Sequence, residues 1–301
     1  MAAKIGAINL ITLDLIYANL SRIPGMGEEV STDSLTVSLG GGPVAALVTA
    51  RRLGASVCLA TCLGEDHMSD IARGFLEEEG LDYRSFYPSD FTASPVNITS
   101  VMTFRNLDRA FVSYFPKTDF YRVSTDSMYS YLKNCVFCIA SDPNPELFQK
   151  LRQNGCKTIY DVGWHDNLNI EDLRDVLKLV YLFAPNDKEA MKLTGAPTPQ
   201  AALLRLADYV EQPIVKMGKE GALLLHQGQI VHAPPTAFLS VDSTGAGDAF
   251  LGGVTYGLLQ GWDILRCVEL GNYAGGKATT AIGCLTAKCS MKEFERMGRL
   301  Q

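Results

Sequence analysis

The residue types best suited to catalysis stand together in the segment Asp242–Phe250, which has the sequence DSTGAGDAF. An amphipathic run, Ala249–Leu259, continues from it, so the segment should lead into a helix. Gly245, Ala246 and Gly247 carry almost no side chain, and they would leave backbone N–H groups uncovered at the positive end of the helix dipole. This pattern predicts an anion hole that could hold a phosphate whose negative charge increases during transfer.

Asp248 stands directly after these small residues, where its negative charge would repel a resting phosphate. A carboxylate has a use in this place if it accepts the proton of a hydroxyl that attacks the phosphate. The same residues could instead form a glycine-rich turn that caps a helix, with Asp248 as a first-turn acid that complements the dipole. The spacing alone leaves both interpretations open.

The composition is that of an ordinary globular protein, with 301 residues of which 47% are hydrophobic and 20% are charged. The 27 basic and 33 acidic side chains give a formal net charge of −6. That balance argues against nucleic acid as the main partner, because binding to a phosphate backbone needs a basic surface. No apolar run approaches the ~20 residues of a membrane span, and the N-terminus lacks a signal pattern. We therefore expect a cytoplasmic protein without a membrane partner, whose cysteines are reduced core thiols.

Short β-rich runs alternate with amphipathic stretches from about residue 124 onward. Apolar strands joined by helical crossovers predict a mostly parallel sheet that is covered by helices on both faces. Gly42–Leu53 and His67–Glu79 extend the pattern into the first half of the chain. The expected strands are Val136–Ala140, Thr158–Asp161, Leu179–Ala184, Ile214–Met217 and Ala222–His226, and the expected helices are Pro145–Gln153, Asn186–Leu193 and Pro199–Tyr209.

Two stretches interrupt this alternation. Ala7–Val37 is rich in β-forming residues around the turn Pro24–Gly27, and Val96–Phe115 has the pattern of a hairpin. Strands outside a βαβ unit must bury a face elsewhere, so we expect a small sheet that projects from the α/β body over the ligand site. Such a sheet is also a candidate interface for a homodimer, because an exposed face or edge invites a partner.

The segment Asp242–Phe250 resembles the signature of the ribokinase-like (PfkB) carbohydrate kinases. The resemblance extends over nearly the whole chain, because weaker family motifs follow one another in the expected order. It implies one ribokinase-like α/β domain over residues 1–301, with a Rossmann-like sheet, helices on both faces, and a β-sheet lid drawn from about 7–37 and 96–115. The weaker motifs are Gly40–Pro43 with Ala50–Gly54, Gly64–Asp66 with Gly80–Asp82, Pro185–Glu189 with Leu193–Gly195, and Lys216–Gly221.

The resemblance further implies an enzyme that transfers the γ-phosphoryl group of ATP, with Mg²⁺ as cofactor, to a primary hydroxyl of a small sugar or sugar-like acceptor. Asp248 would be the general base beside the anion hole. Asn186 and Glu189 would organise the magnesium through water, although the same pair could be only a helix N-cap and a first-turn acid. The implied ATP-binding residues are Asn186, Gly218, Lys219, Thr244, Gly245, Gly247, Asn272 and Gly275.

Two further assignments stay open at this point. Many family members use a monovalent cation beside the anion hole, so we hypothesise a K⁺ site at Asp242 and the backbone near Ala281 and Gly283. Lys219 would lie along the nucleotide, but it could equally be a solvated lysine of a turn.

The substrate side departs from the family pattern. Ala45 stands where the family usually has an Asn that contacts sugar hydroxyls. Asp14 is the nearest candidate for the usual substrate-binding Asp, but its spacing from Gly6 is about three residues too long, so it could be a lid residue without a ligand. The usual D-x-N-x-R pattern is replaced by DVGWH in Asp161–His165. The candidate acceptor contacts are Asp14, Gly41, Gly42, Ala45, Asp142, Asp161, Trp164 and Asp248.

Two other functions remain as alternatives. A nucleoside kinase of the same family would need an aromatic wall for a base, and Phe104, Phe111, Tyr114 and Phe115 could supply it, although they could equally be packing or interface residues. A binding protein that has lost turnover would fit the altered substrate residues. The intact anion hole, Asp248, Asn186 and Glu189 favour the sugar kinase, with a lid that closes over the acceptor and excludes water.

Overall fold

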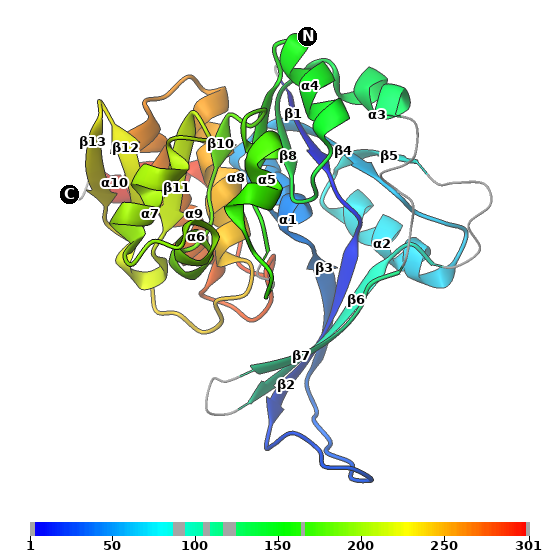
Figure 1. Cartoon of the computed structure of the whole chain (residues 1–301). Coiled ribbons are helices and arrows are strands. Elements are labelled where there is room, and N and C mark those ends of the chain that lie inside the picture. Colours follow the sequence, from blue (N-terminus) through cyan, green and yellow to red (C-terminus); the bar gives the residue numbers. More distant parts are fainter. Residues whose placement is uncertain (1–3, 87–93, 105–108, 117–124, 164–165, 299–301) are drawn as a thin grey trace.

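A computed structural model describes residues 4–86, 94–104, 109–116, 125–163 and 166–298 (Figure 1). Its largest element is a nine-stranded sheet with the order β13-β12-β11-β10-β9-β8-β1-β4-β5. All neighbours from β5 to β11 are parallel, and β12 and β13 add an antiparallel edge. The strands are β1 (Lys4–Ile8), β4 (Ser56–Thr61), β5 (Asp82–Ser85), β8 (Cys135–Ala140), β9 (Lys157–Tyr160), β10 (Leu182–Phe183), β11 (Gln212–Lys216), β12 (Ala222–His226) and β13 (Gln229–Ala233).

Helices bury both faces of this sheet, as the apolar strands require. Alternate residues of a strand enter different cores: on β8, Phe137 and Ile139 join one cluster, and Cys138 joins the other. The first face is covered by α1 (Gly42–Leu53), α2 (His67–Glu78), α8 (Ala246–Leu259) and α9 (Ile264–Ala278), with α10 (Met291–Gly298) packed outside α8 and α9. The second face is covered by α3 (Thr125–Leu132), α4 (Pro145–Gln153), α5 (Ile170–Leu177), α6 (Asp187–Thr194) and α7 (Pro199–Leu206).

The predicted layout is therefore confirmed, with small differences at element ends. The α8 helix begins at Ala246, three residues before the predicted amphipathic run, because Gly245 is its N-cap. The β10 strand has only two residues, within the predicted range Leu179–Ala184. Among the described helices, none is long and apolar enough to cross a membrane.

The second sheet has four strands in the order β3-β2-β6-β7 and projects from the body (Figure 1). We call this sheet the lid. Its β6 and β7 form the predicted hairpin, whereas Ala7 and Ile8, included in the expected lid range, belong to β1 of the large sheet, where they pair with β4 and β8. The lid strands are β2 (Thr12–Leu20), β3 (Leu35–Gly40), β6 (Asn97–Phe104) and β7 (Arg109–Tyr114).

The two faces of the lid differ in chemistry. Asp14 of β2 stands opposite Ser38 of β3 and Thr99 of β6, and Thr99 stands opposite Ser113 of β7. Because paired residues share a face, these polar side chains lie on one side of the lid, together with Arg109, which reaches the body. The other face carries the exposed apolar side chains Leu35, Val37, Val112 and Tyr114.

Candidate active site

The N-terminus of α8 is held open by glycine. Gly245 has a φ of 74°, in the left-handed region, and an added Cβ would lie 2.2 Å from Cβ of Cys284, so no other residue fits. The Ala246 N–H makes a turn contact of 3.3 Å with the carbonyl oxygen of Ser243. No side chain of the described residues competes with an anion for the N–H groups of the first turn, where the sequence predicts an anion hole.

Asp248 lies in that first turn, in a cluster of charged side chains. Burial, opposed by Lys216 and reinforced by three carboxylates, raises the pKa of Asp248 to about 7. An added Cβ on Gly42 would lie 3.0 Å from Oδ1 of Asp248, so the Gly-Gly motif that begins α1 leaves room for this carboxylate. A carboxyl with a pKa near 7 can accept a proton at neutral pH. The three carboxylates are Asp14, Asp161 and Glu189.

Lys216, at the end of β11, supplies the positive charge in this cluster. Its Nζ lies 2.5 Å from Oδ2 of Asp161, and both side chains are largely buried, at 13% and 14% exposure. Although burial opposes its charge, the carboxylates of Asp161, Asp248 and Glu189 hold the pKa of Lys216 above its usual value. In the sequence, Lys216 appears only as the first residue of the motif Lys216–Gly221, without a role of its own. A lysine that ends an apolar strand just before a turn is the signal that could have marked it as a site residue.

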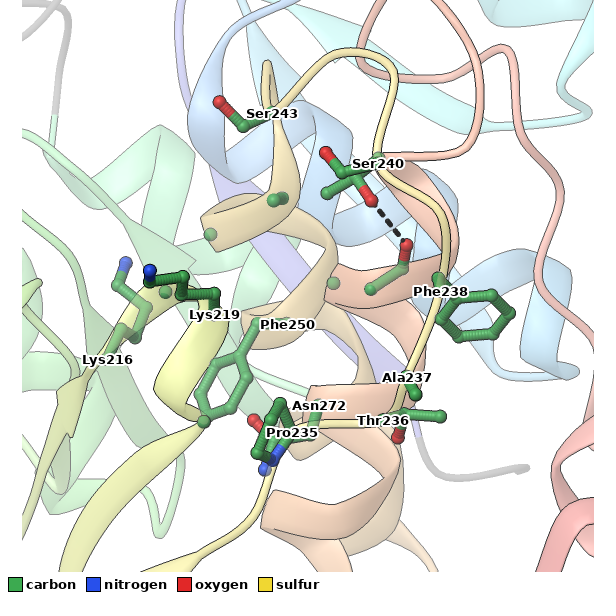
Figure 2. Close-up of a pocket in the computed structure, with 17 residues that line it drawn as sticks. Lys216, Lys219, Pro235, Thr236, Ala237, Phe238, Ser240, Ser243, Phe250 and Asn272 are labelled. Carbon is green, nitrogen blue, oxygen red and sulfur yellow. Dashed lines mark hydrogen bonds between the residues drawn. The ribbon is translucent and has the colours of Figure 1, made fainter.

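A pocket of about 440 Å³ lies beside the helix N-terminus (Figure 2). Lys216 and Lys219 lie on one side of it, and the chain around Phe238 lies on the other (Figure 2). Five of the predicted nucleotide-binding residues line this pocket, and the segment between β13 and α8 adds a wall that was not expected from the sequence. The five are Gly218, Lys219, Gly247, Asn272 and Gly275, and the added residues are Pro235, Thr236, Ala237 and Phe238.

Asn272 supports this added wall through its side-chain amide. Its Nδ2 donates to the carbonyl oxygens of Ala233 and Pro234, at 3.2 and 2.8 Å. Gly275 lies one helical turn later, and an added Cβ there would lie 2.8 Å from the carbonyl oxygen of Ala246, so the glycine allows α9 to approach α8. Asn272 thus holds the backbone at the start of the added wall, and Gly275 sets how closely α9 packs against α8 beside the pocket.

Asn186 and Glu189 form a capping box at the start of α6. Oδ1 of Asn186 accepts a hydrogen bond from the Glu189 N–H at 2.9 Å, and Oε2 of Glu189 accepts one from the Asn186 N–H at 2.8 Å. The cap that the sequence left as an alternative is therefore present. The backbone of Asn186 also pairs with that of Lys216 in an isolated parallel β-bridge, which places the capping box beside the charged cluster.

The residues around this capping box fit an outer-sphere magnesium site. Among the described residues, no group of three or more His, Cys, Asp or Glu side chains could hold a metal ion by itself. A magnesium ion that keeps most of its water and is shared with phosphates needs fewer protein ligands. The Glu189 carboxylate, which lies beside Asp161 and Lys216, has the chemistry to accept a hydrogen bond from a water of that shell.

Comparison with known proteins identifies the family of this site. The sequence model described as pfkB family carbohydrate kinase matches residues 1–289. The chain belongs to this family. The predicted class of enzyme, an ATP-dependent carbohydrate kinase, and the predicted ribokinase-like fold are thereby confirmed.

Individual relatives of this kinase are distant. The kinase is 25% identical over 311 residues to a deoxyribokinase of Salmonella typhi, and the match covers 96% of this chain and 97% of that one. It is 22% identical over 262 residues to an ATP-dependent 6-phosphofructokinase of Thermoanaerobacterium thermosaccharolyticum, with 81% and 80% covered. The solved structure of Arabidopsis thaliana ribokinase complexed with ribose and ATP aligns with a TM-score of 0.82 at 21% identity, over 99% of both chains.

Asp242 of the kinase connects the anion-hole loop with the lid. Its Oδ1 accepts hydrogen bonds from the N–H and Oγ1 of Thr244, at 2.9 and 2.7 Å, and its Oδ2 accepts one from the Gly283 N–H at 2.9 Å. Arg109 of β7 donates from Nη1 to Oδ1 of Asp242 at 3.2 Å and from Nη2 to Oγ of Ser243 at 2.8 Å. Burial opposes the charge of Asp242, but these donors hold its pKa below the usual value.

Several predicted acceptor contacts gather between the lid and α1. Asp14 is 8% exposed, and burial together with the charge of Asp242 raises its pKa to about 6. An added Cβ on Gly41 would lie 3.0 Å from Oδ1 of Asn9, whose Nδ2 donates to Oγ of Ser141 at 2.8 Å. The structure therefore adds Asn9, which the sequence analysis did not identify, to this corner.

The remaining predicted residues lie at different depths. Asp142 is exposed on the bend after β8, next to Ser141. Ala45 is 1% exposed and belongs to the core cluster of α1, rather than to a surface that a ligand could touch in this conformation. Trp164 lies outside the described residues.

Proposed function

We propose that this kinase transfers the γ-phosphoryl group of ATP in line to a primary hydroxyl of a small sugar or sugar-like polyol. The observation that carries the proposal is the position of Asp248, a carboxyl with a pKa of about 7 in the first turn of a helix whose N-terminus is open beside the nucleotide pocket. Asp248 accepts the proton of the attacking hydroxyl. The N–H groups of Gly245, Ala246 and Gly247 hold the negative charge of the transferring group.

ATP is assigned to the pocket beside α8, with its adenine toward Asn272 and Gly275 and its phosphates toward Lys219 and Gly247. The positions of these residues around one pocket support this orientation. Magnesium bound to the phosphates would neutralise part of their charge, and Asn186 and Glu189 would contact its water shell. These residues orient the nucleotide so that the γ-phosphoryl group faces Asp248.

The acceptor is assigned to the space between the polar face of the lid and α1. Hydroxyl, amide and carboxylate groups that face this corner, including Asp14, Asn9 and Ser38, have the chemistry that pairs with sugar hydroxyls. Oγ of Ser38 is buried without a hydrogen-bond partner among the described residues, so an acceptor hydroxyl that reached it would supply the missing partner. Closure of the lid would keep water from the γ-phosphate.

A K⁺ ion at Asp242 and the backbone near Ala281 and Gly283 remains a hypothesis within this proposal. The carboxylate of Asp242 and the left-handed turn at Gly283, with a φ of 91°, stand next to the anion hole. Arg109 already places a positive charge on this carboxylate. Replacement of K⁺ by N-methylglucamine in the assay would lower kcat if the ion binds.

A nucleoside kinase is the second candidate, and the position of Phe111 favours it. Phe111 pairs with Val101 in the lid, which places it on the same face as Asp14, and its ring is half exposed. An aromatic ring on that face could stack on a base. Tyr114 lies on the opposite face, so it cannot belong to the same wall.

The apolar outer face of the lid supports a homodimer. Val112 and Tyr114 are 63% and 51% exposed, and Leu35 and Val37 continue the same face. A second copy of the chain is the occupant we propose, because a face of this kind would match its own copy across a two-fold axis. The dimer is proposed as an assembly of two lids, as the sequence suggests.

The first experiment is an ADP-release assay with Mg·ATP and a panel of sugars, sugar acids, polyols and nucleosides. Turnover of one sugar, lost in Asp248→Asn, is the expected result. Turnover of nucleosides alone would favour the second candidate. Full activity in Asp248→Asn would overturn the assignment of the base.

A further inference from the structure

Lys216 lies where β11, the segment before α6 and the nucleotide pocket meet. It ends β11, its backbone N–H donates to the carbonyl oxygen of Pro185 at 2.9 Å, and its side chain lines the nucleotide pocket. An added Cβ on Gly247 would lie 3.1 Å from its Nζ. The ammonium therefore stands over the second glycine of the anion hole, on the side of the pocket that also carries Lys219 (Figure 2).

The surroundings of Lys216 keep it charged and fixed. Asp161, which follows β9, accepts a hydrogen bond from Nζ at 2.5 Å. Both groups are largely buried, and a buried ion pair of this kind contributes little net stability, because desolvation offsets the attraction. An ammonium has three N–H donors, and Asp161 uses one of them. Within the part of the chain that the structure describes, the remaining donors have no hydrogen-bond partner, so they are available beside Gly247, where the anion hole would hold a phosphoryl oxygen.

We propose that Lys216 is a catalytic residue, which donates a hydrogen bond to a non-bridging oxygen of the transferring γ-phosphoryl group, and that Asp161 is its positioning residue. The proposal rests on the proposed function of this site and adds a residue to it. In the reaction, the bond between phosphorus and the oxygen that bridges the β- and γ-phosphates breaks, and that oxygen leaves with the electron pair on ADP. The acceptor oxygen forms the new bond to phosphorus, and its proton goes to Asp248. Lys216 gives up no proton in this step.

The proposal predicts a difference between ATP and ADP. Only ATP has the phosphoryl group that Lys216 would contact, so removal of the lysine should weaken ATP binding and leave ADP binding nearly unchanged. A hydrogen bond to a charged group contributes enough to change affinity by roughly 10- to 100-fold. A residue that only supports the fold would affect both nucleotides alike.

The test is calorimetric titration of the full chain with Mg·ATP and with Mg·ADP, without an acceptor. Lys216→Met alone would leave the Asp161 carboxylate buried without its partner, so the main variant is Lys216→Met with Asp161→Asn, which removes both charges. Thermal unfolding checks that it is folded. Lys157→Met, which removes an exposed lysine from the opposite end of the strands, is the matched control and should bind both nucleotides as the wild type does.

The expected result is a loss of roughly 10- to 100-fold in ATP affinity for the double variant, with ADP affinity within about twofold of the wild type. Lys216→Arg should recover part of the ATP affinity and part of kcat, because it keeps the charge. Equal losses for ATP and ADP, or no loss for either, would overturn the assignment of Lys216. Asp248→Asn is measured alongside: if it keeps full activity, the proposed base fails, and the nucleotide titrations still decide the role of Lys216.

Discussion

The pH dependence of kcat/KM tests the proposed base most directly. Burial and the nearby carboxylates raise the pKa of Asp248 from 3.8 to about 7. Only the ionised carboxylate can accept a proton, so the active fraction of free enzyme should be about 90% at pH 8, about 10% at pH 6 and about 1% at pH 5. kcat/KM should therefore fall close to 100-fold between pH 8 and pH 5, and Asp14, with a pKa of about 6, should steepen the acid limb if the acceptor needs its charge.

The assay is initial-rate ADP release with acceptor and Mg·ATP both below their KM, from pH 5 to pH 9. Asp248→Asn should lose about two or more orders of magnitude in kcat and should no longer show the limb near pH 7. Asp175→Asn removes an α5 carboxyl that is 89% exposed, and it should keep the wild-type profile. A wild-type profile that is flat down to pH 5 would refute the reasoning, because a base with an ordinary carboxyl pKa would stay ionised there.

Four further predictions follow from the same contacts. Asp248→Asn should unfold at a higher temperature than the wild type at pH 8, because burial opposes the ionised carboxylate of the wild type. The difference in unfolding temperature should shrink toward pH 4, since between pH 4 and pH 7 the unfolded chain releases the Asp248 proton and the folded chain retains it. Gly245→Ala should cost about 2 kcal/mol or more in a urea titration, whereas Gly228→Ala, with a φ of 77° and open space around it, should cost about 1 kcal/mol. Arg109→Ala should raise the KM for the acceptor roughly threefold to tenfold with a smaller change in kcat, since it removes the hydrogen bonds from the lid to the anion-hole loop. Val112→Glu should give a monomer by light scattering if the lids form the dimer, and an unchanged mass would contradict that interface.

The sequence allowed most of the fold to be predicted because its strongest patterns are local. Apolar strands and amphipathic helices alternate with the periods that a covered parallel sheet requires, and α1 and α4 have the predicted bounds. The anion hole was predictable for a similar reason, because Gly245–Gly247 and Asp248 are neighbours in the chain. Such features need no knowledge of what another segment contributes.

The features that could not be predicted depend on contacts between distant segments. The pair of Lys216 and Asp161 joins residues 55 positions apart, and nothing in either local sequence identifies the other. Arg109 lies about 130 residues before Asp242, and its role follows only from the pairing of β6 and β7 that turns it toward the body. Ala45 shows a different limit: its position in a linear motif placed it among the expected acceptor contacts, but the motif could not indicate that α1 packs it in the core at 1% exposure.

The charged cluster explains why such distant contacts matter for the reaction. Asp14, Asp161, Glu189 and Asp248 bring four carboxylates to one corner of the fold, and the pKa values of all four are raised. A cluster of like charges destabilises the folded state, so a chain selected for stability alone would not be expected to keep it. Lys216 offsets part of this repulsion, because its ammonium lies among these carboxylates. Burial and this repulsion together raise the pKa of Asp248 and make it a stronger base for the acceptor proton, so the environment that costs the folded state stability also tunes the group for transfer.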